Sequence, residues 1–92
     1  MGVDFLDLQF RLERSFALKL PSGWLDAIAD PVRRDVQAGP IHAMIRRSFA
    51  DDGRPLPPSA WHRVKLCIAQ AGGCSPWKVG EQTWLVKELG FA

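Results

Sequence analysis

The sequence has few of the side chains that usually hold metals or act as nucleophiles. Its 92 residues include only two cysteines, Cys67 and Cys74, and only two histidines, His42 and His62. These four residues lack the paired spacings of zinc sites, so we expect no metal. We interpret Cys67 as a small core residue on a helix and Cys74 as a loop thiol. A disulfide or redox role for the two thiols is the alternative.

Long apolar runs, export signals and strand patterns are also lacking. No stretch approaches the roughly 20 consecutive apolar residues that a membrane span requires. The start, Met-Gly-Val-Asp-Phe-Leu-Asp, carries acids where a secretory signal carries bases. There is no period-two alternation between turns, no low-complexity tract and no internal repeat. The sequence therefore predicts a soluble, cytoplasmic protein without β-strands.

Enzyme motifs are missing around the serines, cysteines and histidines. Neither His42 nor His62 accompanies a nucleophile motif, and both are typical of partly exposed surface histidines. Gly72-Gly73 is not followed by the Gly-Lys-Ser or Gly-Lys-Thr of a phosphate-binding loop. We expect no catalytic activity and no cofactor. The formal net charge of +2 is too small for nucleic-acid binding to be the first interpretation.

Amphipathic helical patterns are what the sequence does contain. In residues 3–18 the apolar residues at three- and four-residue steps are Phe5, Leu8, Leu12 and Phe16, and Leu6 and Phe10 widen the same stripe. Pro21 ends this helix, and Ser22 can cap a short second helix that ends near Asp30, just before a proline. Pro40 suits the first turn of a third helix that extends to about Asp51.

Turn formers and prolines dominate residues 51–58, which we interpret as a linker. Ser59 is a suitable N-cap for a fourth helix that ends at Gly72-Gly73. The remaining twenty residues are interpreted as a structured loop that packs over the helices. The apolar residues that favour this interpretation are Trp77, Val79, Trp84, Leu85, Val86 and Leu89.

The helical segments predict one all-α domain over residues 1–92, built as a bundle of three to four helices. A chain of this length holds a single modest core. The predicted members of that core are Phe5, Leu8, Leu12, Phe16, Ile41, Ile45, Val64, Ile68 and Leu85.

Residues 61–92 carry a recognisable helix-and-loop motif. Its main positions are Arg63, Val64, Lys65, Ile68, Gly73 and Val79, followed by Leu-Val-Lys-Glu-Leu-Gly at residues 85–90. Acyl carrier proteins have an R-V-K-x-x-I type run, a glycine-containing loop, a Val or Ile and an acidic D-L-G-x-D sequence at matching intervals. Residues 59–92 therefore resemble the first half of an acyl carrier protein.

The N-terminal part resembles the second half of the sequences in that family. Val3-Asp4 is similar to the L-D of its D-S-L-D motif, and Leu20-Pro21 is similar to the I-P after the next helix. Further similar positions are Leu8, Phe10, Leu12, Glu13 and Phe16 in that helix, and residues 35–39 with Ile41 at the start of the last helix. Residues 31–34 are a short insertion. Residues 1–50 thus resemble the family's second half, which implies a circularly permuted, acyl-carrier-protein-like bundle.

The resemblance also implies that the attachment site has been lost. Carrier proteins hold a phosphopantetheine arm on the serine of D-S-L, and the thiol of that arm carries the acyl group. The matching position here is Gly2, or Phe5 if the first helix is shifted by three residues. Neither residue has a hydroxyl. We therefore expect a carrier-like domain without the arm.

The expected function is that of a non-enzymatic protein-interaction module, and the resemblance implies partners in fatty-acid or polyketide synthesis. In the family the helix after the serine is strongly acidic and docks on basic surfaces. Here acids are followed by bases, and the possible partner-binding surface consists of Asp4, Asp7, Arg11 and Arg14. A solvated helix face is the alternative interpretation of these charges.

Two other functions stay open. A small nucleic-acid-binding module could use Arg33, Arg34, Arg46 and Arg47, which bracket the third helix and could contact phosphates. A structural assembly protein could keep the bundle as a scaffold and exchange its halves between two chains, forming a domain-swapped homodimer.

Overall fold

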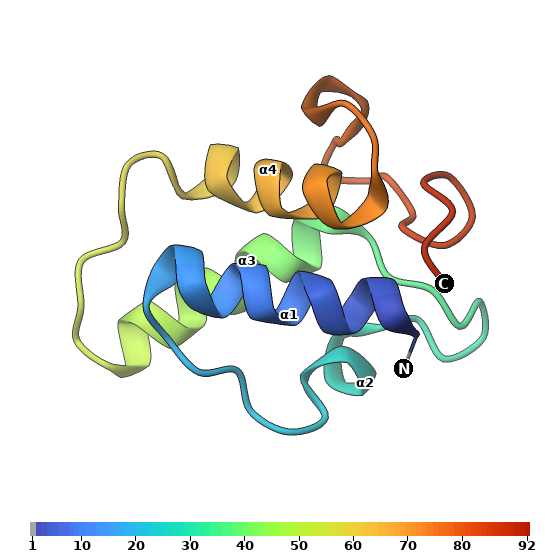
Figure 1. The fold of residues 1–92 in the computed structure, drawn as a ribbon. Helices are drawn as coiled ribbons and strands as arrows, with labels where there is room; N and C mark the ends of the chain where they lie inside the picture. The colour runs from blue at the N-terminus through green and yellow to red at the C-terminus, as the bar shows by residue number, and fades with distance from the viewer. Residues whose placement is uncertain (1) are drawn as a thin grey trace.

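Four α-helices and one short 3₁₀ helix make up the computed structural model, which describes residues 2–92 (Figure 1). They are α1 (Val3–Phe16), α2 (Trp24–Ile28), α3 (Ala38–Asp51), α4 (Ala60–Gly72) and η1 (Pro76–Lys78). Residues 2–92 contain two isolated β-bridges but no β-strand, so the prediction of an all-helical chain is confirmed. Met1, the first residue of the domain expected over residues 1–92, lies outside the described residues. Within that described part, no helix is both long enough and apolar enough to cross a bilayer.

The packing of the helices brings the two ends of the sequence together. α4 packs against both α1 and α3, and α2 packs against α3. In Figure 1, α1 and α4 lie side by side and run in opposite directions, and residues 52–59 connect α3 to α4 around one end of the molecule. The chain therefore closes on itself through the contact between α1 and α4.

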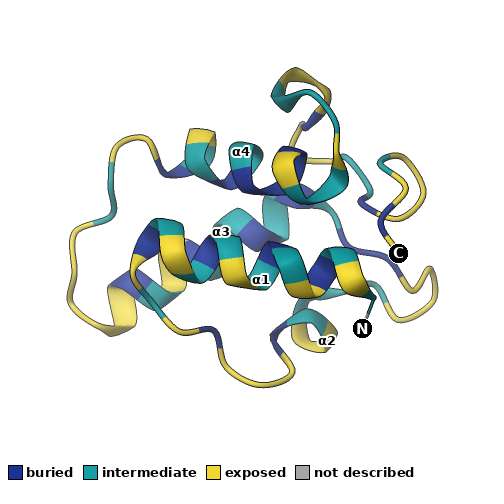
Figure 2. Ribbon diagram, in the orientation of Figure 1, coloured by how far each residue is buried: buried dark blue, intermediate teal, exposed yellow. Residues whose placement is uncertain are grey.

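The predicted core is confirmed. All nine predicted residues are buried, and they belong to one continuous apolar cluster, which also includes Leu20, Trp24, Val36 and Phe91. Figure 2 shows the buried positions of α1 and α4 along the faces that meet. Burial of each large apolar side chain contributes about 1.5–3 kcal/mol to stability, so this cluster is the main source of stability.

The first helix ends at Phe16, two residues earlier than predicted. Ala17 adopts a left-handed backbone conformation with φ of 50°, which stops the helix. Two arginines then bind carbonyl oxygens that the last turn leaves without helical partners. Arg54 donates to the carbonyls of Phe16 and Ala17 at 3.2 Å, and Arg63 donates to that of Ser15 at 3.4 Å. The linker and α4 thus cap α1.

The start of α2 also differs from the prediction, whereas α3 and α4 start as predicted. Gly23, not Ser22, precedes α2, because the chain takes a φ of 77° there, which only glycine adopts without strain. α3 begins at Ala38 and keeps Pro40 in its first turn. Ser59 precedes α4 as predicted, but its side chain makes no capping hydrogen bond.

Four apolar residues that were expected to pack inside lie on the surface instead. Leu6 and Phe10 are 47% and 56% exposed, because they lie on the side of α1 that faces away from α4. Trp77 on η1 is 84% exposed and Val86 is 39% exposed, whereas Leu85 is fully buried. The prediction is therefore wrong for these four positions.

Leu12→Ala should lower the free energy of unfolding by about 3 kcal/mol, because it leaves a cavity where α1 packs against α4. Leu6→Ala is the matched control on the same helix, and because Leu6 is 47% exposed it should cost less than about 1 kcal/mol. Urea unfolding measures both values. Equal losses would contradict the assignment of the buried face of α1.

Candidate functional site

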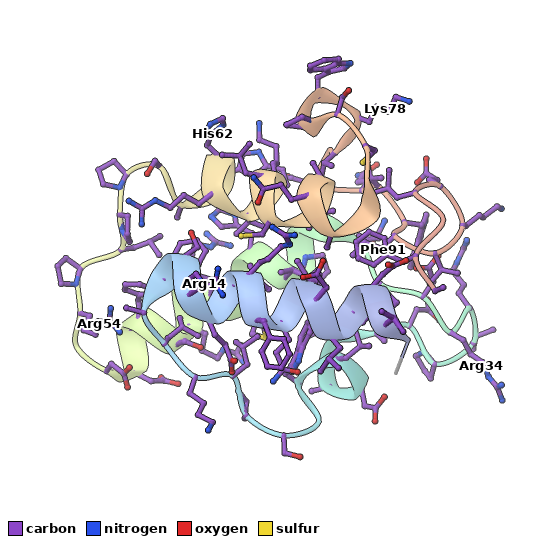
Figure 3. All side chains as sticks on the ribbon, in the orientation of Figure 1. Arg14, Arg34, Arg54, His62, Lys78 and Phe91 are labelled. Carbon is purple, nitrogen blue, oxygen red and sulfur yellow. The ribbon has the colours of Figure 1, made fainter. Side chains whose placement is uncertain are left out.

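The first turn of α1 lies against the last residues of the chain. The Asp4 N–H donates to the carbonyl oxygen of Ala92 at 3.1 Å, and the Ala92 N–H donates to Asp4 Oδ2 at 2.9 Å. The rings of Phe5 and Phe91 are in contact, with their centroids 5.0 Å apart. Figure 3 shows Phe91 between the C-terminal segment and the start of α1. The two ends of the sequence therefore meet at the N-terminus of α1.

Gly2 lies at this junction, where no side chain fits. A Cβ atom at position 2 would lie 1.8 Å from the carbonyl carbon and oxygen of Ala92, far inside van der Waals contact. Phe5, the other match to the family serine, is buried in the core with 6% exposure. Because glycine and phenylalanine have no hydroxyl group, neither position can be the attachment point of an arm.

The four charged residues predicted as a partner surface all lie on α1, but they make different contacts. The Asp4 carboxylate binds the C-terminal backbone, whereas Asp7 and Arg11 pair one turn apart on α1, with Oδ1 and Nε 3.1 Å apart. These two side chains are 43% and 39% exposed, so their pairing contributes little to stability. Arg11 also donates to Gln70 Oε1 on α4 at 3.1 Å, and Arg14 is exposed one turn further along α1.

Arg11 and Arg14 meet a third arginine, Arg63, in a groove between α1 and α4. The groove has a volume of about 240 Å³, and its other lining residues are Ser15, Leu66, Cys67 and Gln70. The Arg63 guanidinium lies over the ring of Phe16, 6.0 Å from its centroid. We call this site the arginine groove. The sequence marked Arg63 only as part of a helix motif, although its place one turn before the buried Cys67 could have suggested that it flanks the helix contact.

Beside the arginine groove, α1 exposes apolar side chains on its outer face. Val3, Leu6 and Phe10 are 80%, 47% and 56% exposed, and their spacing of three and four residues places them along one line. Figure 2 shows this exposed face of α1 opposite its buried one. We call these three residues the apolar stripe. Phe10 and Arg14 lie one turn apart, so the stripe runs into the rim of the arginine groove.

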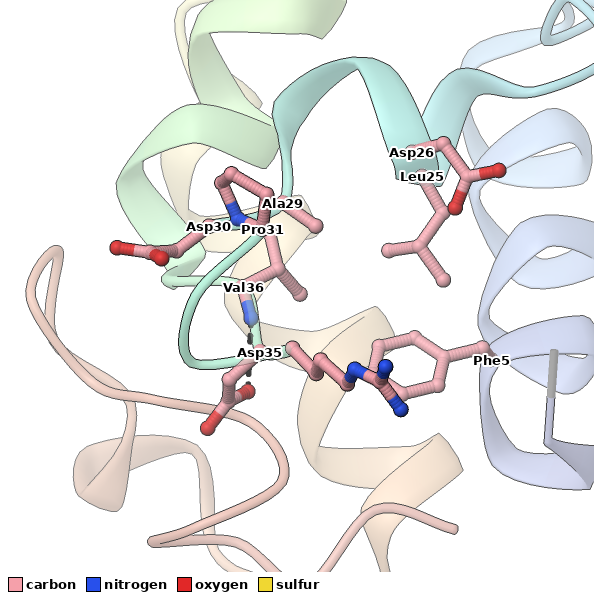
Figure 4. A pocket seen from close by; sticks show the side chains of 9 residues that line it. Phe5, Leu25, Asp26, Ala29, Asp30, Pro31, Asp35 and Val36 are labelled. Carbon is pink, nitrogen blue, oxygen red and sulfur yellow. Dashed lines mark hydrogen bonds between the residues drawn. The ribbon is translucent and has the colours of Figure 1, made fainter.

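A cavity of about 490 Å³ lies between α2, the start of α1 and the turn over residues 29–36 (Figure 4). Phe5, Leu25 and Val36 give it apolar walls, and Arg34 and Asp35 are among its polar residues. The cavity lies close to the junction of the two chain ends, since Phe5 and Leu25 also line the hollow beside Ala92.

Asp35 has a structural role in this region. Its side chain is buried, with 6% exposure, and accepts hydrogen bonds from the N–H groups of Val36, Val86 and Lys87 at 2.7, 2.8 and 3.0 Å. Figure 4 shows the first of these bonds. Because Val86 and Lys87 lie on the C-terminal segment, Asp35 holds that segment against the turn that leads into α3.

The histidines and cysteines occupy ordinary positions. His42 stacks on Trp61 with the ring centroids 5.3 Å apart, and burial lowers the pKa of His42. His62 is exposed on α4 (Figure 3). Cys67 is buried, as predicted, and burial raises the pKa of its thiol; Cys74 is half-buried, and both thiols are free. Among residues 2–92, no three His, Cys, Asp or Glu side chains gather in a way that could hold a metal ion.

The arginines of the nucleic-acid alternative are distributed over different parts of the surface. Arg33 lies over the Trp84 ring, 4.8 Å from its centroid, and Arg34 projects at one end of the molecule (Figure 3). Arg46 and Arg47 lie on α3, about 12 Å along the helix from its start at the usual rise per residue. Arg47 lines an apolar groove between α2 and α3. Arg33 and Arg34 thus precede α3, whereas Arg46 and Arg47 lie more than two turns into it.

No protein-family model, no curated protein and no solved structure matches this chain. A function is therefore proposed from the sequence and the geometry of the chain itself.

Asp35→Ala should lower the free energy of unfolding by about 2 kcal/mol, because it leaves backbone N–H groups of the C-terminal segment without their acceptor. Hydrogen exchange at Val86 and Lys87 should become faster. Asp30→Ala is the matched control in the same turn: Asp30 accepts two N–H bonds at exposed residues, so its loss should destabilise the chain much less than that of Asp35. Unchanged exchange at Val86 in the Asp35 variant would contradict this role.

Proposed function

We propose that this chain is a non-enzymatic, acyl-carrier-like domain with permuted helix order and without a phosphopantetheine arm. In this proposal α4 and residues 73–92 take the place of the first half of the carrier fold. α1, α2 and α3 take the place of its second half. The domain works as a protein-interaction module whose partner is an enzyme of fatty-acid or polyketide synthesis.

The junction of Asp4 with Ala92 is the observation that carries this proposal. In the family order, residues 59–92 lead directly into residues 1–50, so the permutation requires residue 92 to lie beside the start of α1. Two hydrogen bonds, of 3.1 and 2.9 Å, join these positions. The antiparallel contact of α1 with α4 supports the same order, because these helices would be consecutive in the unpermuted chain.

The loss of the arm is supported by the same junction. Gly2 stands where the attachment serine is expected, and a Cβ there would overlap the backbone of Ala92. The Phe5 ring is buried and has no hydroxyl. With no hydroxyl at either position, the domain has no attachment point for the thiol arm that carries an acyl chain. In this proposal the domain therefore acts through binding at its surface.

The surface proposed for docking is the outer face of α1. Its apolar stripe of Val3, Leu6 and Phe10 is exposed, and exposed apolar residues that lie in a line are typical of faces that a partner covers. The opposite face of α1 is buried against α4, so the helix can bind a partner without leaving the core. The stripe is therefore available in the folded domain.

Incubation with a phosphopantetheinyl transferase and coenzyme A should leave the intact mass of the chain unchanged, because neither Gly2 nor Phe5 can form the phosphodiester. Intact-mass spectrometry makes this measurement. A carrier protein with an intact D-S-L motif in the same reaction shows that the transferase is active. A mass gain of one arm would overturn the proposal.

A chain rearranged into the family order should also fold. We expect residues 59–92, joined to residues 2–58 by a short glycine-serine bridge, to unfold cooperatively within about 2 kcal/mol of the original chain, since adjacent termini tolerate permutation. A control that opens the chain inside α4, between Val64 and Lys65, should not unfold cooperatively. Circular dichroism during urea unfolding compares the three chains. Loss of cooperativity in the family-order chain would count against the permutation.

A further inference from the structure

We propose that the arginine groove receives the carboxylates of an acidic helical segment on the partner protein. This inference rests on the proposed docking function of α1 and adds the chemistry of what docks there. It goes beyond the charges recognised in the sequence, because Arg63 and Gln70 come from α4 and only the fold brings them beside α1.

The charge balance of the groove favours an anion. Arg11, Arg14 and Arg63 line it, no Asp or Glu is among its lining residues, and Asp7 pairs with Arg11 at 3.1 Å. One acid against three guanidinium groups leaves the site positive. Because this pair is about two-fifths exposed, solvent already weakens it, and an incoming carboxylate can share Arg11.

Two of the arginines are held in place before any ligand arrives. Arg11 is fixed by Asp7 and by Gln70 Oε1 at 3.1 Å, and Arg63 lies over Phe16 while donating to the carbonyl of Ser15 at 3.4 Å. Ordering a long side chain on binding costs conformational entropy, so preordered arginines make binding more favourable. Guanidinium groups also accept carboxylates in a bidentate geometry.

The size and surroundings of the groove indicate a protein segment and not a small molecule or a nucleic acid. Its volume of about 240 Å³ is below the range of about 300–1,000 Å³ that is usual for small-molecule pockets. Phe10, at 56% exposure, lies one turn from Arg14, so a ligand that fills the groove also meets the apolar stripe. An amphipathic helix with acids beside leucines covers both surfaces, whereas a phosphate backbone would leave the stripe uncovered.

The experiment uses a synthetic amphipathic helical peptide with leucines on one face and glutamates beside them. A second peptide with lysines in place of the glutamates is the matched probe. Binding to the ¹⁵N-labelled chain is followed through the Nε–Hε signals of Arg11, Arg14 and Arg63 and through backbone amides. We expect the glutamate peptide to shift these signals to saturation and the lysine peptide to leave them unchanged.

Arg14→Glu is the main variant, because Arg14 is exposed and its substitution leaves the helix contact in place. It should weaken glutamate-peptide binding by at least roughly ten-fold, which corresponds to about 1.4 kcal/mol. Arg63→Ala should also weaken binding. The control, Arg46→Glu, makes the same charge change on α3 and should stay within about two-fold, because Arg46 does not line the groove and salt screens an exposed charge that makes no direct contact.

Equal weakening by Arg14→Glu and Arg46→Glu would overturn the proposal, since it would show attraction to the overall charge only. Tighter binding of inorganic phosphate or of a short oligonucleotide to the same arginines would also overturn it, in favour of a phosphate ligand.

These outcomes are independent of the transferase assay. A mass gain in that assay would remove the carrier-like proposal without changing the peptide result. Failure of the glutamate peptide to bind would remove the acidic-segment proposal without changing the mass result.

Discussion

The contact between α1 and α4 organises the molecule. The two helices come from opposite ends of the sequence, and each has an apolar face that water would otherwise cover. Burying these faces against one another offsets the entropy lost when distant segments of the chain are brought together. With α4 packed against α1, the C-terminal segment that follows α4 reaches the N-terminus of α1, where Asp4 and Ala92 are joined by two hydrogen bonds.

This contact also divides the surface of α1 into parts with different roles. The face toward α4 is buried, the border carries the arginine groove, and the far side carries the apolar stripe. Asp35 and the arginines that cap the end of α1 hold the connecting segments without occupying the outer face. In the proposed function the outer face of α1 binds another protein, and the excess of arginines in the groove supports the proposal that this partner is acidic there.

Much of the interior could be predicted from the sequence, because buried residues of a helix recur at three- and four-residue steps. That periodicity identified Leu8 and Leu12 on one helix and Val64 and Ile68 on another, all of which are fully buried. It could not define how wide the buried face is, and so Leu6 and Phe10 were placed inside. The width depends on which helices flank α1, and that is a long-range property of the fold.

The candidate site was less predictable for the same reason. Arg11 and Arg14 are visible as charges on one helix, but their neighbour Arg63 is about fifty residues away and joins them only when α1 and α4 pack together. Trp77 is a further position that apolar character alone does not predict: it lies on η1 and is 84% exposed.

Methyl NOEs between α1 and α4 in solution can establish whether a single chain closes in this way. The structure predicts cross-peaks from Leu8 and Leu12 to Val64 and Ile68 within one chain, and none that survive an isotope filter in a mixture of labelled and unlabelled chains. Absence of these cross-peaks, or their appearance only between chains, would contradict the closed single-chain bundle.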